Sequence, residues 1–293
     1  MEENNYSPME AKSTAIPLII GGIIIAVSII LGVFFIGYNI SNPSRLYNEA
    51  VKSYQEGDYK QAYSKFVELD DLIGLEYKNS IEIYNDCAYK YASELVESND
   101  NFTARFILFG EEHRTNLVES DYGNSRALGL KVAQIGDTVY FGNYNGAPLE
   151  WIVANDDEGN LCLVAKEIVE RKKYDDYKGD KDYITWQNSS LRQWLNSTFY
   201  EQAFLNAQKK AIVNYYDDIN DCYDYVSLPS TTNISVIYNY YKDIVSDDIW
   251  LYSYNYSDSK NVIEHKEIDT SNYFGTFGVK PTVWIDTHKV TEV

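Results

Sequence analysis

The longest hydrophobic run in the chain lies near its start. No charged residue occurs between residues 13 and 44, and residues 16–36 are apolar at almost every position. With a rise of ~1.5 Å per residue, such a run forms a helix of roughly 31 Å, which matches the hydrocarbon layer of a bilayer. The pattern therefore predicts a single transmembrane helix over residues 16–38, preceded by a short cytoplasmic tail over residues 1–15.

The orientation of this helix is predicted from the usual topology of proteins with a single anchor, because the flanking charges do not decide it. Lys12 lies on one side and Arg45 and Lys52 on the other, so the positive charges do not decide the topology. A single anchor followed by a long domain most often keeps its tail inside. The expected localisation is thus the cell membrane, single-pass, with the bulk of the chain extracytoplasmic and the membrane itself as a partner. A cleaved signal peptide is the competing interpretation, but its apolar region would be shorter.

After the apolar run, the hydrophobic period becomes helical. Two stripes with intervals of three or four residues flank a Gly-Asp break: Leu46, Ala50 and Tyr54, then Ala62, Phe66 and Leu69. The arrangement resembles a tetratricopeptide-type helical hairpin, and a weaker second copy follows with Arg105 where a small residue is expected. Two hairpins fall short of the roughly three needed for a binding groove. Residues 39–131 are therefore expected to form a tetratricopeptide-like helical stalk.

From residue 132 onward, segments in which apolar residues recur every second position are mixed with segments in which they recur every third or fourth position. Strands are predicted by apolar alternation at these places: residues 137–142, 149–154, 161–165, 225–228, 249–252 and 279–285. Helical spacing recurs at Leu191, Trp194 and Leu195, which Ser190 can cap, and again over residues 234–241. Short strands mixed with a few helices indicate a C-terminal α+β domain over residues 132–293.

Charge and cysteine content exclude several classes of protein. Lys and Arg number 25 and Asp and Glu 44, so the formal net charge is −19. Nucleic acid binding needs a cationic surface, and nucleic acid is therefore not expected as a partner. Cys87, Cys162 and Cys222 are too few and too scattered for a disulfide framework or a zinc cage, and their disulfide state stays open.

Five motif blocks follow one another through the C-terminal part. They read GDxxxFGxYxGxPxEWxV from Gly136, TW…LRxWLN from Thr185, an Asn-Asp pair, a WWLRS-like block around Trp250, and a GVRPxxW-like block from Gly278. In this order they resemble a bacterial family of domains of unknown function. Its late motifs are similar to those of C-type-lectin-like and formylglycine-generating-enzyme-like folds, so the resemblance implies a C-type-lectin-like fold. It implies no activity, because the family has none assigned.

Three tryptophans in these blocks have apolar neighbours and are expected in the core. They are Trp186, Trp194 and Trp284. Truncation of a buried tryptophan costs ~3–5 kcal/mol, so each would contribute substantially to stability.

The candidate ligand-binding residues are polar or aromatic members of the late blocks: Asn220, Asp221, Asp224, Trp250 and Tyr252. Tyr252 replaces the family's usual Arg, so an anionic ligand gains no charge-assisted bond there. A neutral sugar stacked on Trp250 or Tyr252 fits better. The oxygen atoms of Asn220, Asp221 and Asp224 also suit Ca²⁺, the one cofactor considered, although a solvated acidic loop is the simpler interpretation.

No catalytic motif is present, so no catalytic residue is assigned and an enzyme is not favoured. The sequence favours a membrane-anchored cell-surface protein for non-catalytic recognition of a glycan or an envelope protein. A membrane-bound hydrolase with paired carboxylates, or a scaffold acting through the helical repeats, are the alternatives. The 28 tyrosines suit a recognition surface, although AT-rich coding is the favoured explanation of their number.

Overall fold

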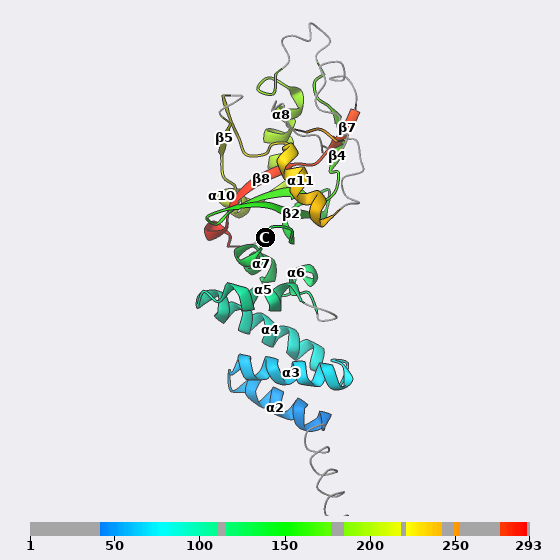
Figure 1. Ribbon diagram of the computed structural model, residues 1–293, viewed down its shortest axis with the longest axis vertical. Coiled ribbons are helices and arrows are strands. Elements are labelled where there is room, and N and C mark those ends of the chain that lie inside the picture. The colour runs from blue at the N-terminus through cyan, green and yellow to red at the C-terminus, as the bar shows by residue number, and fades with distance from the viewer. Residues whose placement is uncertain are drawn as a thin grey trace, which may run out of the picture. The chain divides into compact units, whose positions relative to one another are not determined.

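The structure is a computed structural model that describes residues 42–110, 115–176, 185–217, 221–241, 249–251 and 276–291. The chain divides into two compact units, residues 1–84 and residues 85–293. Helices and short antiparallel strands make it an α+β protein, in agreement with that part of the expected fold class (Figure 1). The domain boundary expected between residues 131 and 132 stays a prediction.

The first unit contains a helical hairpin made of α2 (Pro43–Gln55) and α3 (Tyr59–Ile73). The N-cap residues Asn42 and Asp58 each accept a hydrogen bond from the backbone N–H three residues further on, which satisfies a donor that the first turn leaves unpaired. Ala50 and Ala62 are fully buried, and their small side chains let the two helices approach closely. The two apolar stripes thus form the interior of this hairpin, while its relation to tetratricopeptide repeats stays a prediction.

Four helices lead from the unit boundary to the first strand: α4 (Ser80–Glu97), α5 (Asn101–Phe109), α6 (Leu117–Ser120) and α7 (Ser125–Val132). In α5, Arg105 occupies the place where the repeat pattern has a small residue. Its guanidinium donates to both carboxylate oxygens of Asp137, directly before the first strand. The departure from the repeat pattern therefore has a physical reason, because this ion pair ties α5 to the sheet.

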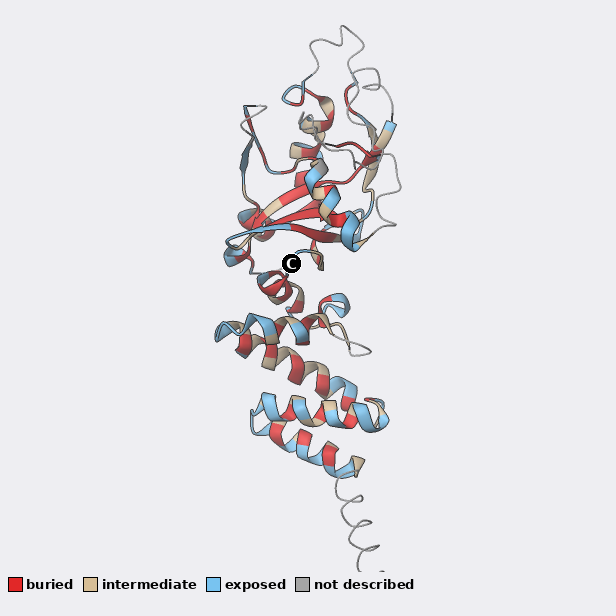
Figure 2. Ribbon diagram, viewed as in Figure 1, coloured by how far each residue is buried: buried red, intermediate tan, exposed pale blue. Residues whose placement is uncertain are grey.

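The main sheet is antiparallel with the strand order β1-β2-β3-β8: β1 (Thr138–Tyr144), β2 (Ala147–Asp157), β3 (Asn160–Ala165) and β8 (Thr282–Asp286). Both faces of this sheet are buried (Figure 2). On one face, Trp151 lies in the main core and donates from Nε1 to the carbonyl of Phe141 at 2.7 Å. On the other face, α11 (Thr231–Tyr240) packs Ile234 and Ile237 against β2 and β3.

Two smaller antiparallel sheets flank the main one: β4 (Glu170–Lys173) with β7 (Thr276–Val279), and β5 (Tyr215–Asp217) with β6 (Cys222–Asp224). Short helical segments lie between β4 and β5: α8 (Ser190–Trp194), the π-helical turn η2 (Leu195–Phe199), α9 (Tyr200–Ala203) and α10 (Asn206–Ala211). The 3₁₀ turn η5 (Thr287–Lys289) follows β8. The cap of α8 is Ser189 and not the expected Ser190. The sequence analysis did not predict β5 and β6.

The three tryptophans expected in the core are not equally buried. Trp186 is buried, as expected. Trp194 and Trp284 are only half-buried, so the expectation is wrong for both. Trp151 and Trp250 are instead the largest fully buried side chains among the described residues.

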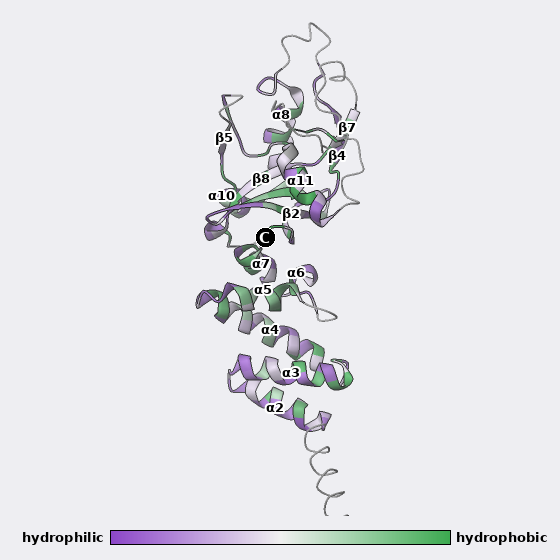
Figure 3. Cartoon of the chain, viewed as in Figure 1, coloured by the Kyte–Doolittle hydropathy of each residue, from purple (hydrophilic) through white to green (hydrophobic). Residues whose placement is uncertain are grey.

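The expectation of a single-pass membrane protein is corrected. Within the described ranges, no helix combines the length and the apolar character needed to cross a bilayer. Hydrophilic and hydrophobic positions are mixed along α3 and α4 (Figure 3), and α4, the longest described helix, has 18 residues with charged side chains among them. The predicted span over residues 16–38 and the tail over residues 1–15 lie outside the described residues. The transmembrane helix, the membrane as partner and the extracytoplasmic placement are accordingly unsupported and not retained.

The burial of all three cysteines predicts a chain whose thiols do not react in the native state. Burial raises the pKa of the Cys162 thiol to about 12. At pH 8, roughly one ten-thousandth of this thiol is then the reactive thiolate. We expect Ellman's reagent to label no cysteine rapidly at pH 8 and three cysteines in denaturant. Rapid labelling of one native thiol, located by peptide mapping, would contradict this packing.

Candidate functional site

Exposed tyrosines gather on the hairpin that β5 and β6 form. Tyr216 lies directly opposite Tyr223 in the strand pairing, so the two side chains leave the same face of the hairpin. Their exposed fractions are 44% and 61%, and their ring centroids are 4.9 Å apart. Tyr215 and Tyr225, at the two outer ends, are also exposed. Because side chains alternate along a strand, Tyr215 leaves the other face of β5, together with its strand partner Asp224. We refer to the four exposed tyrosines of this hairpin as the tyrosine surface, in which Tyr216 and Tyr223 share one face.

Two partly buried aromatic rings support the outer tyrosines. Tyr225 stacks on Tyr200 with a centroid distance of 4.8 Å and an interplanar angle of 20°. Tyr215 stacks on Trp284 at 6.0 Å and 13°. Burial raises the pKa of the Tyr200 hydroxyl to about 12, and the neighbouring Tyr225 and Glu201 add to the rise. Tyr200 is therefore neutral at physiological pH and supports an uncharged surface.

A buried carboxylate fixes the hairpin to the core. Asp224 accepts hydrogen bonds from the indole Nε1 of Trp186 and from Nε of Arg192, both at 2.7 Å. The same guanidinium donates to the carbonyl of Tyr223 at 3.0 Å. Because Asp224 is only 5% exposed, these charge-assisted bonds replace the water that the carboxylate loses on burial.

Asn196 secures the chain where it leaves the hairpin. Its side-chain oxygen accepts from the backbone N–H of Tyr225 at 2.8 Å and of Val226 at 3.1 Å. Its amide nitrogen donates to the carbonyl of Val226 at 2.8 Å. Trp186, Arg192 and Asn196 all belong to the TW…LRxWLN block, so this block holds the tyrosine surface in place.

The described members of the predicted site do not share one role. Asp224 is buried in the network above. Trp250 is 2% exposed, and its Nε1 donates to the carbonyl of Lys172 at 2.7 Å, so its ring faces the core. Asp221 is exposed and accepts from the hydroxyl of Tyr216 at 2.8 Å. Asn220 and Tyr252 lie outside the described residues. Of the three described residues, Asp221 alone reaches the surface, and ligand binding by the set of five stays a prediction.

A calcium site receives no support from the described part of the chain. There, no three His, Cys, Asp or Glu side chains gather closely enough to hold a metal ion. Asp221 and Asp224 have the hydrogen-bond partners given above, and Asn220, the third expected ligand, lies outside the described residues. Calcium at this position stays a prediction.

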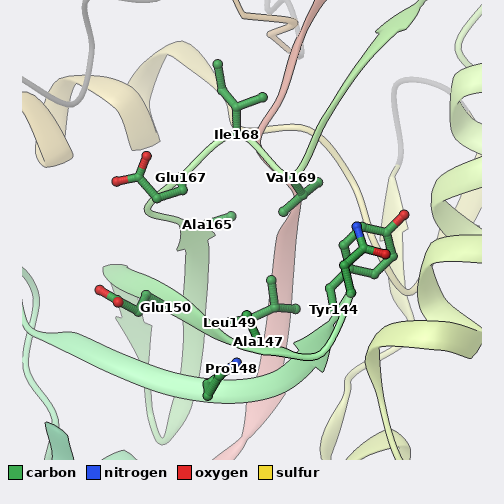
Figure 4. Close-up of a pocket in the computed structure, with 10 residues that line it drawn as sticks. Tyr144, Ala147, Pro148, Leu149, Glu150, Ala165, Glu167, Ile168 and Val169 are labelled. Atoms are coloured by element: carbon green, nitrogen blue, oxygen red, sulfur yellow. The ribbon is translucent and has the colours of Figure 1, made fainter.

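A separate pocket of about 270 Å³ lies beside β2 and the segment that follows β3 (Figure 4). Leu149, Ala165 and Val169 line its apolar part. The carboxylates of Glu150 and Glu167 lie on the side away from Tyr144 (Figure 4).

The charges at this pocket are largely paired. Glu150 accepts from Nζ of Lys166 at 2.8 Å, and this hydrogen bond raises the pKa of the Lys166 ammonium against the lowering effect of its burial. Across the pocket, the hydroxyl of Tyr144 donates to Glu170 at 3.2 Å, while burial and the Glu170 charge raise the pKa of Tyr144. Lys166 thus stays cationic beside Glu150 and Tyr144 stays neutral.

Comparison with known proteins finds that part of this region is similar to a family. Residues 158–274 match a family described as Domain of unknown function (DUF6273). The matched range includes α8, the tyrosine hairpin and α11, and it supports the expected resemblance to a domain of unknown function. The C-type-lectin-like fold is not confirmed, since no solved structure matches the chain. No curated protein matches it either.

The tyrosine surface was not predicted, although the sequence contains a pattern that indicates it. Tyr216, Tyr223 and Tyr225 flank an acidic turn, and Tyr223 and Tyr225 are two residues apart. A period of two around a polar turn is the pattern of a hairpin. The acidic side chains within residues 217–224 were interpreted as a possible metal site instead.

The Asp224 network predicts a large difference between two neighbouring acids. Asp224→Ala leaves the Arg192 guanidinium and the Trp186 indole without their shared acceptor, and we expect a loss of about 3–5 kcal/mol in the free energy of unfolding. Asp221→Asn removes an equal charge at an exposed position with positive φ that Asn tolerates, and should change stability by less than about 0.5 kcal/mol. Urea denaturation of both variants measures the difference. Equal stability of the two variants would show that Asp224 does not anchor the hairpin.

Proposed function

We propose that the second unit is a non-catalytic recognition module that binds a neutral glycan through the tyrosine surface. The observation that carries this proposal is the exposure of Tyr216 and Tyr223, side by side, on a hairpin fixed by Asp224. An isolated exposed tyrosine is ordinary, whereas an exposed pair that shares one face of a supported hairpin, with two further tyrosines beside it, is typical of a contact surface.

The chemistry of the tyrosine surface suits a sugar. A phenol ring offers a flat apolar face to the C–H bonds of a pyranose, and its hydroxyl exchanges hydrogen bonds with sugar hydroxyls. Tyrosine has few rotatable bonds, so its immobilisation on binding costs little entropy. The carboxylate of Asp221, which accepts from the Tyr216 hydroxyl, offers a further acceptor at the edge of the surface.

The charge of the protein favours an uncharged ligand at this place. The chain has a net charge of −19, and Asp221 lies at the edge of the tyrosine surface. An anionic sugar would meet like charge there, while a neutral sugar would not. The C-type-lectin-like fold implied by the motif blocks belongs to this proposal as well, and the α+β architecture is compatible with it.

One observation favours the hydrolase alternative. Glu150 and Glu167 lie on the same side of the pocket in Figure 4, and glycoside hydrolysis uses two carboxyl groups. The carboxylate of Glu150, however, forms an ion pair with Nζ of Lys166 at 2.8 Å. One of the two carboxyl groups that would act on a substrate is therefore already paired. The alternative thus demands that substrate displace Lys166, and the recognition module is the simpler proposal. Release of reducing sugar by the full-length chain, abolished in Glu167→Gln, would favour the hydrolase.

Binding of neutral oligosaccharides to the full-length chain tests the proposal. A glycan array first identifies a ligand, and calorimetry then compares Tyr216→Ala and Tyr223→Ala with the unaltered protein. Loss of one stacking ring removes about 1–2 kcal/mol, so we expect each substitution to weaken binding roughly five- to thirtyfold.

The matched control is Tyr238→Ala on α11, which removes another exposed tyrosine ring that lies outside the hairpin. It should leave the affinity unchanged. Equal affinity in all three variants would place the ligand elsewhere. Absence of binding to every neutral glycan would contradict the proposal and favour a protein ligand.

A further inference from the structure

A groove of about 360 Å³ lies against β4 and α8 and has an unusual charge for this protein. Its polar and aromatic lining consists of Arg171, Lys172, Lys173, Asp176, Ser190, Trp194 and Thr276. Three cations thus meet one carboxylate, in a chain whose acids exceed its bases by 19. The lining of this groove is therefore positively charged, in contrast to the net negative charge of the chain.

The acids closest in sequence leave much of this charge unbalanced. Glu170 is 3.3 Å from Nζ of Lys172 and also accepts from the Tyr144 hydroxyl. Asp175 is buried and accepts from the backbone N–H of Ser190 at 2.8 Å. Among the residues for which side chains are described, no carboxylate lies within 4.0 Å of Arg171 or Lys173. These two exposed cations therefore remain available to a ligand.

The cations stand on a rigid support. Trp250 donates to the carbonyl of Lys172 from the core, and its ring packs edge-on against Phe277 of the partner strand β7 at 4.6 Å. The Lys172 ammonium lies 4.5 Å from the centroid of the Trp194 ring, a cation–π contact that directs it toward α8. Side chains alternate along a strand, so Arg171 and Lys173 leave the face of β4 opposite to that of Lys172; both are exposed, and all three residues line the groove.

We propose that this groove binds the phosphate group of a small phosphorylated ligand, such as a sugar phosphate. A phosphate monoester has a charge of about −2 at neutral pH, which matches the excess of cations over Asp176. The planar fork of a guanidinium pairs with two phosphate oxygens at once, and a lysine adds a mobile charge. The cavity is larger than a phosphate ion, and the half-buried Trp194 forms a wall for the organic part of the ligand.

This inference does not depend on the proposed glycan binding. The tyrosine surface is uncharged and was assigned to neutral sugars, whereas the groove requires an anion. The two sites are separable by substitution, since no residue belongs to both.

Calorimetry of the full-length chain with glucose 6-phosphate, inorganic phosphate, glucose and glucuronate tests the groove. We expect binding of glucose 6-phosphate, weaker binding of inorganic phosphate, no glucose binding that depends on Arg171 or Lys173, and a steep loss of affinity for glucose 6-phosphate as salt rises. The double variant Arg171→Gln, Lys173→Gln should weaken glucose 6-phosphate binding by roughly tenfold or more, because it loses two charge-assisted contacts.

The control keeps the net charge equal. Lys131→Gln with Lys210→Gln removes two exposed cations outside the groove and should leave the affinity unchanged. Tyr216→Ala should also leave it unchanged, which separates this site from the tyrosine surface. Equal weakening in the two double variants would reduce the effect to overall charge and overturn the proposal. Equal affinity for glucuronate, or no binding of any phosphate, would overturn it as well.

Discussion

The buried carboxylate of Asp224 is the interaction on which the surface of the second unit depends. Burial of an ionised carboxyl group is costly unless each oxygen finds a strong donor. Trp186 and Arg192 supply one donor to each oxygen, at 2.7 Å in both cases. These partners come from a loop and from α8, so the carboxylate draws three separate segments together. The hairpin could not hold its tyrosines outward without this inner attachment.

A chain of aromatic contacts extends the attachment to β4. Trp186 packs against Tyr174 with ring centroids 6.3 Å apart, and Tyr174 packs against Trp250 at 5.4 Å. Trp250 then holds the backbone of β4 through the carbonyl of Lys172. The tyrosine surface and the cationic groove therefore share one interior. Asp224 and Trp250, two residues of the motif blocks that were candidates for ligand binding, form part of the support beneath these two surfaces.

Local patterns predicted a substantial part of the fold. Apolar alternation over residues 149–154 and 161–165 predicted strands where β2 and β3 lie. The helix of α11 followed from its spacing in the same way. The N-cap was misplaced by one residue, since Ser189 and Ser190 are chemically equivalent and only the backbone decides between them. Hairpin β5–β6 was missed because its acids obscured the alternation of its tyrosines.

The site was less predictable than the fold for a physical reason. Whether Trp250 faces a ligand or the core depends on β4 and β7, which its own sequence neighbourhood does not reveal. Trp194 and Trp284 were expected in the core and are half-buried. Helical spacing and motif position indicate which way a side chain points, but they do not indicate how much other structure covers it. Long-range packing decides burial, and a single sequence records it only indirectly.

The pairing of β3 with β8 has a consequence for how the protein is made. Leu163 pairs with Val283, and both side chains lie in the main core. Contacts between residues so distant in sequence form slowly, because the intervening chain loses much of its freedom first. During synthesis the apolar strands β1 to β3 emerge long before β8 exists. Until then the edge of β3 has unpaired backbone groups, so the nascent chain passes through an interval in which it can join another strand or a chaperone in place of its own.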